Sequence, residues 1–287
     1  MIITVTCNPA IDKTIVNNQT VFDIGGKGIN VSKVLKELKI DTLATGLLGK
    51  NNGQLVVDDL NKHNIDNHFI EVNGNVRTNT KEIINNELIE HNEDGPLISE
   101  DDVNRLFEYL SNFSNDIVVI SGSAPSSVEP HTYMKMIELL KEKNNYVILD
   151  TSNDLLRYGV QAKPNIIKPN KDEACSMFEI EYDENTIIDK CKDLGIDLVC
   201  VSMGKDGAIF IGNDVVKCRT PQTKICSSVG AGDAMVAALV YAKVKNLDTQ
   251  EMIRMVMATA SAACETLGTK PPTLNSINVK KNDVVFR

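Results

Sequence analysis

The apolar residues of this chain follow two spacings in turn, one typical of buried strands and one typical of amphipathic helices. Short apolar runs rich in β-branched residues predict strands at 2–6, 42–48, 116–120, 146–150, 165–168 and 198–202. Apolar residues three or four positions apart predict helices at 29–38, 54–62, 101–113 and 234–245, with further helices beginning near 130, 171 and 185. Strands that alternate with helices predict an α/β fold with three layers and a mostly parallel central sheet.

One region departs from this alternation. Residues 69–72 and 77–89 resemble extended strands in which polar and apolar residues alternate, and Asn73-Gly74-Asn75 and Asn85-Asn86 are typical of turns with positive φ. A ribbon that is polar on both faces cannot form a core, so we interpret this region as an antiparallel flap over the carboxyl ends of the strands. A surface hairpin without contact to ligand is the alternative interpretation.

Composition and charge restrict the class of protein. The chain has 287 residues, of which 42% are hydrophobic, enough to bury the core of one large domain. Its formal net charge of -9 argues against a nucleic-acid partner, because phosphate backbones are bound by clustered Lys and Arg. No run approaches the roughly 20 apolar residues of a membrane span. The first residues lack the basic start of a signal peptide, so we expect no membrane partner and a cytoplasmic location.

The seven cysteines are odd in number and contain no C-x-x-C pair. This pattern indicates neither a disulfide framework nor a zinc site. We expect most of these residues to act as small buried hydrophobes.

The segment Gly230-Ala231-Gly232-Asp233 lies directly before the apolar helix at 234–245. Its two glycines allow a tight turn, and the backbone amides at the start of the helix form a site for an anion. Asp233 would repel a bound phosphate, which is useful only if the carboxylate takes a proton from a nucleophile that attacks this phosphate. A glycine turn in which Asp233 caps the helix is the alternative.

Two further loops lie between a strand and a helix. Gly25-Gly26-Lys27-Gly28-Ile29-Asn30 brings free amides, a lysine and an asparagine to a helix start, where a phosphorylated ligand could dock. Within 168–173, Asn170 and Glu173 are three residues apart and could hold a hydrated Mg²⁺. An acidic first turn that offsets the helix dipole is the alternative. The chain has neither a Walker P-loop nor G-x-G-x-x-G, so a P-loop or dinucleotide site is not indicated.

Polar and glycine residues also follow the first strand and the strand at 198–202. Ser202, Gly204 and Gly207 bring backbone to the edge of the expected cavity, although turn formation alone would explain them. Asp12 could accept hydrogen bonds from two sugar hydroxyls, and a merely solvated carboxylate is its alternative.

Five motifs occur in the order in which one enzyme family has them. They are Asn8-Pro9-Ala10-Ile11-Asp12, Gly25-Gly26-Lys27-Gly28-Ile29-Asn30-Val31-Ser32-Lys33-Val34-Leu35, Ser121-Gly122-Ser123, Lys168-Pro169-Asn170-Lys171-Asp172-Glu173 and Gly230-Ala231-Gly232-Asp233. With them the chain resembles, over essentially its whole length, the PfkB-type sugar kinases of the ribokinase-like fold. Within that family it is most similar to the 1-phosphofructokinase and tagatose-6-phosphate kinase branch. The resemblance implies a single ribokinase-like kinase domain over 1–287 with a small β lid formed by about 13–24 and 69–92.

The resemblance also implies a role for each candidate residue in ATP-dependent phosphorylation of a sugar phosphate with Mg²⁺. Asp233 would be the general base, and Gly230, Ala231 and Gly232 would form the hole for the transferring phosphoryl group. Lys27 and Arg77 would hold the phosphate of the sugar, and the full set of expected sugar-binding residues is Asp12, Gly26, Lys27, Asn30, Arg77 and Ser123. The residues expected to bind ATP are Lys168, Asn170, Ser202, Gly204 and Gly207, and Glu173 would hold Mg²⁺ through water.

The resemblance favours fructose 1-phosphate as the substrate and fructose 1,6-bisphosphate as the product. Tagatose 6-phosphate is the alternative, because both ketoses present a phosphate to Lys27 and Arg77 and a primary hydroxyl to Asp233. A third hypothesis, a sugar-phosphate sensor without catalysis, is disfavoured because Asp233, Asn170 and Glu173 are all retained.

The chain departs from the family pattern in the lid. Between Asp12 and Gly25 the family usually has a longer stretch, whereas here only Lys13 to Ile24 intervene, so we expect a shortened lid. Relatives often use the lid for a dimer contact as well as for covering the substrate. A homodimer through the lid is therefore the expected protein partnership, beside the small-molecule sugar phosphate and ATP.

Overall fold

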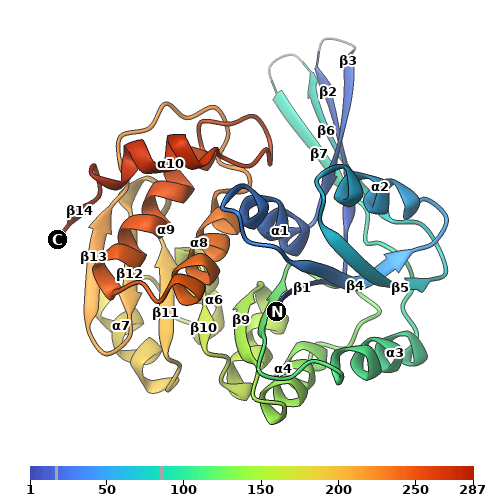
Figure 1. The fold of residues 1–287 in the computed structure, drawn as a ribbon, viewed down its shortest axis with the longest axis horizontal. Coiled ribbons are helices and arrows are strands. Elements are labelled where there is room, and N and C mark those ends of the chain that lie inside the picture. Colours follow the sequence, from blue (N-terminus) through green and yellow to red (C-terminus); the bar gives the residue numbers. More distant parts are fainter. Residues whose placement is uncertain (17–18, 85–86) are drawn as a thin grey trace.

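The computed structural model describes residues 1–16, 19–84 and 87–287, and its main feature is a ten-stranded sheet (Figure 1). Seven of its strands run parallel to one another: β1 (Ile2–Thr6), β4 (Leu43–Gly49), β5 (Asp66–Val72), β8 (Ile117–Ser121), β9 (Tyr146–Asp150), β10 (Ile166–Ile167) and β11 (Leu198–Ser202). Three antiparallel strands extend one edge: β12 (Ala208–Ile211), β13 (Val215–Arg219) and β14 (Val285–Phe286). The mostly parallel α/β sheet expected from the sequence is confirmed.

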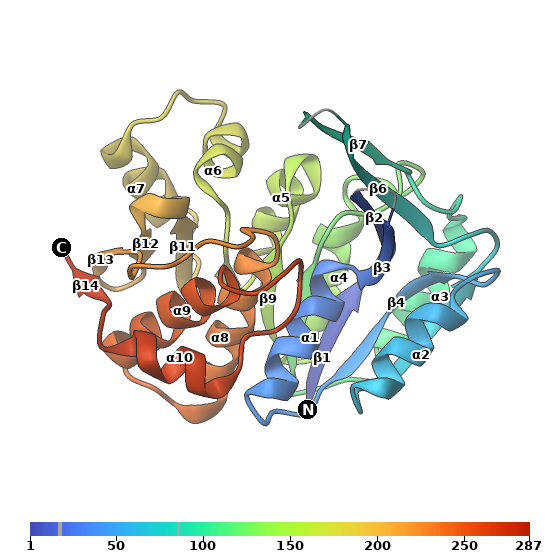
Figure 2. The same cartoon turned by 90° about the horizontal axis from the view of Figure 1, so that it is seen from above.

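Helices cover both faces of this sheet (Figure 2). On one face lie α1 (Lys27–Glu37), α2 (Gln54–Lys62), α8 (Ala231–Lys245), α9 (Thr249–Ala263) and α10 (Leu274–Lys281). On the other lie α3 (Glu100–Leu110), α4 (Thr132–Glu142), α5 (Asn153–Gly159), α6 (Lys171–Phe178) and α7 (Glu184–Asp193). Alternate residues of a strand enter opposite cores, as Ile3 and Val5 do on one side and Ile2 on the other. Both faces are therefore buried, as a parallel sheet requires.

A second, four-stranded sheet projects beyond the carboxyl edge of the first (Figure 1). Its order is β3 (Gln19–Gly25), β2 (Ala10–Val16), β6 (Arg77–Ile84) and β7 (Glu87–Asn92). We name this sheet the lid. It is antiparallel except between β2 and β6, which run parallel. The segment from Lys13 to Ile24, which we expected to be shorter than in the family, supplies most of both β2 and β3.

The expected flap included one segment that does not belong to it. Residues 69–72 form the end of β5, which pairs in parallel with β4 in the central sheet. The assignment was wrong because β5 is the edge strand, and an edge strand that is only partly covered alternates polar and apolar residues as a lid strand does. Asn73 to Asn75 accordingly lead from β5 into β6 and do not close a hairpin. The turn expected at Asn85-Asn86 lies outside the described residues.

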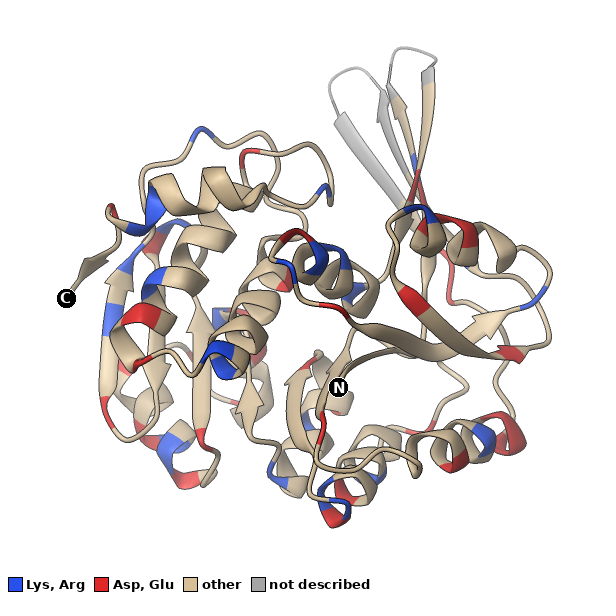
Figure 3. Ribbon diagram, in the orientation of Figure 1, with Lys and Arg blue, Asp and Glu red and all other residues tan. Residues whose placement is uncertain are grey.

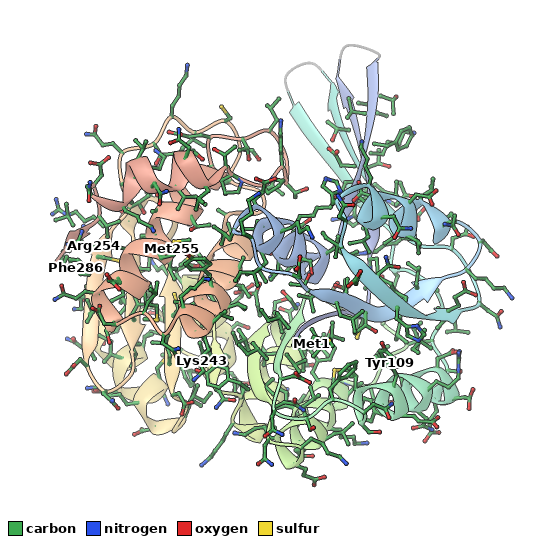
Figure 4. All side chains as sticks on the ribbon, in the orientation of Figure 1. Met1, Tyr109, Lys243, Arg254, Met255 and Phe286 are labelled. Carbon is green, nitrogen blue, oxygen red and sulfur yellow. The ribbon has the colours of Figure 1, made fainter. Side chains whose placement is uncertain are left out.

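Contacts between cationic and aromatic side chains join helices α8 and α9 to strands of the central sheet. The Arg254 guanidinium of α9 lies 4.8 Å from the centre of the Phe286 ring, and Lys243 of α8 lies 4.2 Å from that of Tyr146 (Figure 4).

Acidic and basic residues are interspersed over the described part of the ribbon (Figure 3). Among the described residues, no helix combines the length and apolar character that crossing a bilayer would need. All seven cysteines are free thiols.

Candidate active site

A cleft of about 690 Å³ opens at the carboxyl edge of the central sheet, with the lid on one side and the start of α8 on another. Every candidate residue lines it: Asp12, Gly26, Lys27, Asn30, Arg77, Ser123, Lys168, Asn170, Glu173, Ser202, Gly204, Gly207, Gly230, Ala231, Gly232 and Asp233. The cause is topological, because parallel strands end at the same edge and the loops that follow them meet there.

Asp233 lies in the first turn of α8 and is 6% exposed. Its Oδ2 atom accepts a hydrogen bond of 2.8 Å from Nδ2 of Asn30, in the first turn of α1. Burial, together with the negative charge of Asp150, raises the pKa of Asp233 to about 7, although Asn30, Lys27 and Lys168 act to lower it. A carboxyl group with such a pKa can serve as a general base near neutral pH.

The loop before Asp233 has the conformation that an anion site requires. Gly230 adopts φ 82°, a left-handed conformation that favours glycine, and α8 begins at the next residue. The first amides of a helix have no partner within it and can bind an anion at this end; here the Ala231 amide donates a long hydrogen bond of 3.4 Å to the Ser228 carbonyl. A Cβ atom added to Gly232 would lie 3.3 Å from Nζ of Lys168, so the lysine ammonium lies beside these amides. The loop and the lysine together can hold a highly charged phosphoryl group.

Asp150, at the end of β9, lies beneath this site and was not singled out from the sequence. Its Oδ1 atom lies 3.2 Å from Nζ of Lys168 and 3.4 Å from Nζ of Lys27, and its side chain is fully buried. Burial acts to raise the pKa of Asp150, but the two lysines outweigh it and the pKa is lowered. The only sequence signal for Asp150 was its place as a charged residue at the end of the apolar run at 146–150, because its partners Lys27 and Lys168 are distant in the sequence.

The lid side of the cleft is polar. Asn79 of β6 donates a hydrogen bond of 2.9 Å from Nδ2 to Oδ1 of Asp12 on the neighbouring strand β2. Arg77 begins β6, and burial lowers its pKa against the opposing charges of Asp12 and Asp94. Within the described part of the chain, six buried atoms of residues that line the cleft have no hydrogen-bond partner: Thr6 Oγ1, Asn8 Oδ1, Asn30 Oδ1, Arg77 Nε, Asn79 Oδ1 and Ser261 Oγ. Buried polar groups need partners, so these atoms point to a polar ligand.

The opposite end of the cleft is less polar and was only partly expected. Beyond Ser202, Gly204 and Gly207 it is lined by one face of α9 and by the loop before α8, which contribute Thr220, Thr223, Ile225, Val229, Met257, Ala260, Ser261 and Cys264. A Cβ atom at Gly207, which has φ 109°, would collide with the Cys218 carbonyl of β13, so this position requires glycine. The α9 residues lie at helical spacing, but no polar motif marks them in the sequence.

Comparisons with known proteins agree with this arrangement of motifs. A model of the pfkB family of carbohydrate kinases matches residues 1–275. The chain belongs to this family. The resemblance to PfkB-type kinases and the ribokinase-like fold expected from the sequence are thereby confirmed. As a carbohydrate kinase, the protein uses ATP as co-substrate and transfers a phosphoryl group to an alcohol.

Several relatives of this kinase carry names that bear on its substrate. It is 36% identical to a 1-phosphofructokinase of Bacillus subtilis, over 94% of this chain and 95% of that protein. It is also 36% identical to a 1-phosphofructokinase of Borreliella burgdorferi, over 84% of each chain. The crystal structure of phosphofructokinase-2 from Escherichia coli in complex with potassium superposes with a TM-score of 0.91, at 25% identity and 98% coverage of each chain.

In this kinase, Asn170 and Glu173 form a reciprocal capping box at the start of α6, and Glu173 is one of two acidic residues in the first turn of this helix. Asn170 is the N-cap of α6 and accepts a 2.8 Å hydrogen bond from the amide of Glu173, while Oε2 of Glu173 accepts one of 2.8 Å from the amide of Asn170. The described residues contain no group of three His, Cys, Asp or Glu that could hold a metal ion. The Glu173 carboxylate at this helix start fits a largely hydrated Mg²⁺ that ATP would also hold.

Proposed function

We propose that this kinase transfers the γ-phosphoryl group of ATP to the free primary hydroxyl of fructose 1-phosphate, which yields fructose 1,6-bisphosphate and ADP. The observation that carries the proposal is Asp233, a buried carboxyl group of raised pKa at the start of α8, beside the Gly230–Gly232 turn and Lys168. Two relatives at 36% identity named 1-phosphofructokinase support the choice of sugar.

In the proposed reaction Asp233 accepts the proton of the sugar hydroxyl as the oxygen attacks the γ-phosphorus of ATP. The bond between this phosphorus and the bridging oxygen of ADP breaks as the new bond forms, and the electron pair leaves with ADP. Amides at Gly230, Ala231 and Gly232 and the ammonium of Lys168 stabilise the charge on the transferring group. Asn30 keeps the Asp233 carboxylate oriented through its 2.8 Å hydrogen bond.

The lid side of the cleft would bind the sugar phosphate. Lys27 and Arg77 supply positive charge for the phosphate already present on the substrate. The hydroxyl groups of the sugar would bind Asp12 and Asn30, and Gly26 and Ser123 would contact the sugar where α1 begins and β8 has ended. The unpartnered oxygen of Asn30 and Nε of Arg77 supply an acceptor and a donor that such a ligand can satisfy.

The opposite end of the cleft would bind ATP. Lys168 and Asn170 would face its phosphates, and Ser202, Gly204 and Gly207 would line the path toward the nucleoside. Glu173 would hold Mg²⁺ through water while keeping its hydrogen bond to the Asn170 amide. When bound, Mg²⁺ neutralises phosphate charge and orients the β- and γ-phosphates.

We also propose that two copies of the chain associate through their lids. Val21 and Phe22 on β3 are 56% and 61% exposed, an unusual placement for two adjacent large apolar side chains. Consecutive residues of a strand point to opposite faces, so each face of the lid carries one of these side chains, and the face that carries Phe22 is the one we propose to pack against an identical lid.

A coupled assay of ADP release tests the proposed reaction. Purified enzyme is given ATP and Mg²⁺ with fructose 1-phosphate, tagatose 6-phosphate, fructose 6-phosphate or unphosphorylated sugars. We expect the highest kcat/KM with fructose 1-phosphate, because its phosphate pairs with Lys27 and Arg77 while its free primary hydroxyl faces Asp233. A higher kcat/KM with tagatose 6-phosphate would move the assignment to that sugar, and no release with any sugar would favour the sensor hypothesis.

A further inference from the structure

One oxygen of Asp150 contacts two lysines that belong to different parts of the cleft. Lys27 comes from the start of α1, on the side proposed for the sugar phosphate, and Lys168 follows β10, on the side proposed for ATP. Both ammonium groups lie within 3.4 Å of Oδ1 of Asp150. The remaining oxygen, Oδ2, accepts a hydrogen bond of 3.3 Å from the hydroxyl of Ser121 at the end of β8. The carboxylate is thus held by three separate segments.

The surroundings of Asp150 make this arrangement energetically demanding. The side chains of Asp150 and Lys168 are 0% and 4% exposed, whereas that of Lys27 is 37% exposed toward the cleft. A buried charge is destabilising unless it is paired, so removal of the carboxylate would leave the Lys168 ammonium without its buried counter-ion. The other titratable groups that interact electrostatically with Asp150 or Lys168 are Asp233 from α8, Glu173 from α6 and the Cys200 thiol from β11.

The geometry also links the cluster to the groups proposed to react. The Lys168 ammonium lies beside Gly232, in the turn proposed to hold the transferring phosphoryl group. Asp233, which follows directly, is exposed to the negative charge of Asp150. The position of one carboxylate therefore affects both the placement of the lysines and the electrostatic environment of the base.

We propose that Asp150 is a positioning residue that fixes the ammonium groups of Lys27 and Lys168 relative to each other at the junction of the two substrate sites. This inference rests on the proposed function, because it assigns the junction to a sugar phosphate on one side and ATP on the other. In this role Asp150 acts through the two lysines that it contacts.

The test compares Asp150→Asn with the wild type in the ADP-release assay across pH 5 to 9. We expect kcat to fall on the order of 100-fold, as small displacements of catalytic groups produce. We also expect the acid limb of the kcat profile to move about one pH unit lower, because a negative charge beside Asp233 has been removed. A folded variant with wild-type kcat and an unmoved acid limb would overturn the inference. A purely structural role would lower the melting temperature without moving the acid limb, which also counts against it.

Asp150→Glu separates charge from position and is available if Asp150→Asn does not fold. It keeps the negative charge but displaces it from the lysines, so the acid limb should stay near that of the wild type while kcat remains low. A wild-type kcat in this variant would contradict the positioning role. Asp116→Asn is the matched control, since Asp116 pairs with the chain terminus just before β8, at the opposite edge of the sheet. The wild-type assay with fructose 1-phosphate tests the proposed function separately. If the wild type does not phosphorylate this sugar, the proposed function is wrong, and this result is obtained before any Asp150 variant is compared.

Discussion

At Asp233, two opposing requirements act on one carboxyl group. Burial and the charge of Asp150 favour its neutral form, while Asn30 and the lysines favour the carboxylate, and the resulting pKa is about 7. A base is most effective when its pKa lies near the working pH, so this value suits proton transfer. The same burial lowers stability at neutral pH, because the carboxyl group of the unfolded chain ionises freely in water.

The first prediction concerns the chemical step. Asp233→Asn preserves the shape of the side chain but cannot accept the substrate proton. We expect kcat to fall roughly 100- to 10,000-fold while the KM values for sugar phosphate and ATP change little. Steady-state ADP release at saturating and limiting substrate measures both quantities.

A matched control for this prediction is Asp248→Asn. Asp248 is the N-cap of the neighbouring helix α9, and asparagine caps helices about as well, so activity should be unchanged. Equal activity of Asp233→Asn and the wild type would exclude Asp233 as the base.

The second prediction follows from the direction of the pKa shift. The pKa of Asp233 rises from 3.8 to about 7 on folding, so the folded state binds the proton more tightly. The wild type therefore loses stability as pH rises from about 4 to 7 and loses no more from this group above 7. Asp233→Asn does not titrate, so its advantage in unfolding free energy should grow over this range, to a plateau on the order of 1–4 kcal/mol.

Thermal unfolding of both proteins at several pH values measures this difference. A melting-temperature difference that stays constant from pH 4 to 8 would mean that the carboxyl group is not desolvated in the folded protein. Both the kinetic and the thermal experiments use Asp233→Asn. If this variant loses activity and gains stability, Asp233 is needed for activity although it destabilises the folded protein.

At the scale of elements, sequence patterns were reliable wherever an element buries one regular face. The helix at 54–62 and the strands at 2–6, 146–150 and 198–202 occur where their apolar spacing predicts them. The pattern failed for β5, whose partial exposure mimics a lid strand, and it did not predict α9, whose many small and apolar residues obscure helical periodicity. Local spacing reports which faces are buried but does not report which neighbour buries them.

The third prediction concerns the start of α6. Glu173→Gln keeps an oxygen that can accept the hydrogen bond from the Asn170 amide but removes the charge that would attract hydrated Mg²⁺. We expect a rise in the Mg²⁺ concentration needed for half-maximal activity, with little change in melting temperature. Activity titrated with Mg²⁺ at fixed ATP gives the first quantity, and thermal unfolding gives the second.

The chain supplies a matched control in α3, which begins with the same kind of capping box. There Ser99 is the N-cap and Asp102 is its reciprocal partner, outside the residues that line the cleft. Asp102→Asn makes the equivalent change and should leave the Mg²⁺ requirement unaltered. Similar effects of the two variants on activity would mean that Glu173 serves only as a cap.

At the scale of the whole molecule, the cleft combines segments that only the fold brings together. Most motif residues were predictable because they follow strands, and parallel strands end at one edge, whereas Asp12 lies within the lid strand β2. Their mutual contacts were not, since Asn30 and Asp233 are 203 positions apart and Lys27 and Asp150 are 123 apart. The buried ion-pair cluster at Asp150 therefore became visible only when β8, β9 and β10 were placed side by side.

The last prediction concerns association of two chains through the lid. If the lid face that carries Phe22 packs against a second lid, the wild type should sediment at twice the 31.5 kDa of one chain. Phe22→Asp would place a charge in that interface and should shift the mass to that of a single chain. Leu97→Asp is the control, because Leu97 is 82% exposed but lies after β7, outside the lid. A monomeric wild type, or equal dissociation in both variants, would show that Phe22 does not mediate the contact.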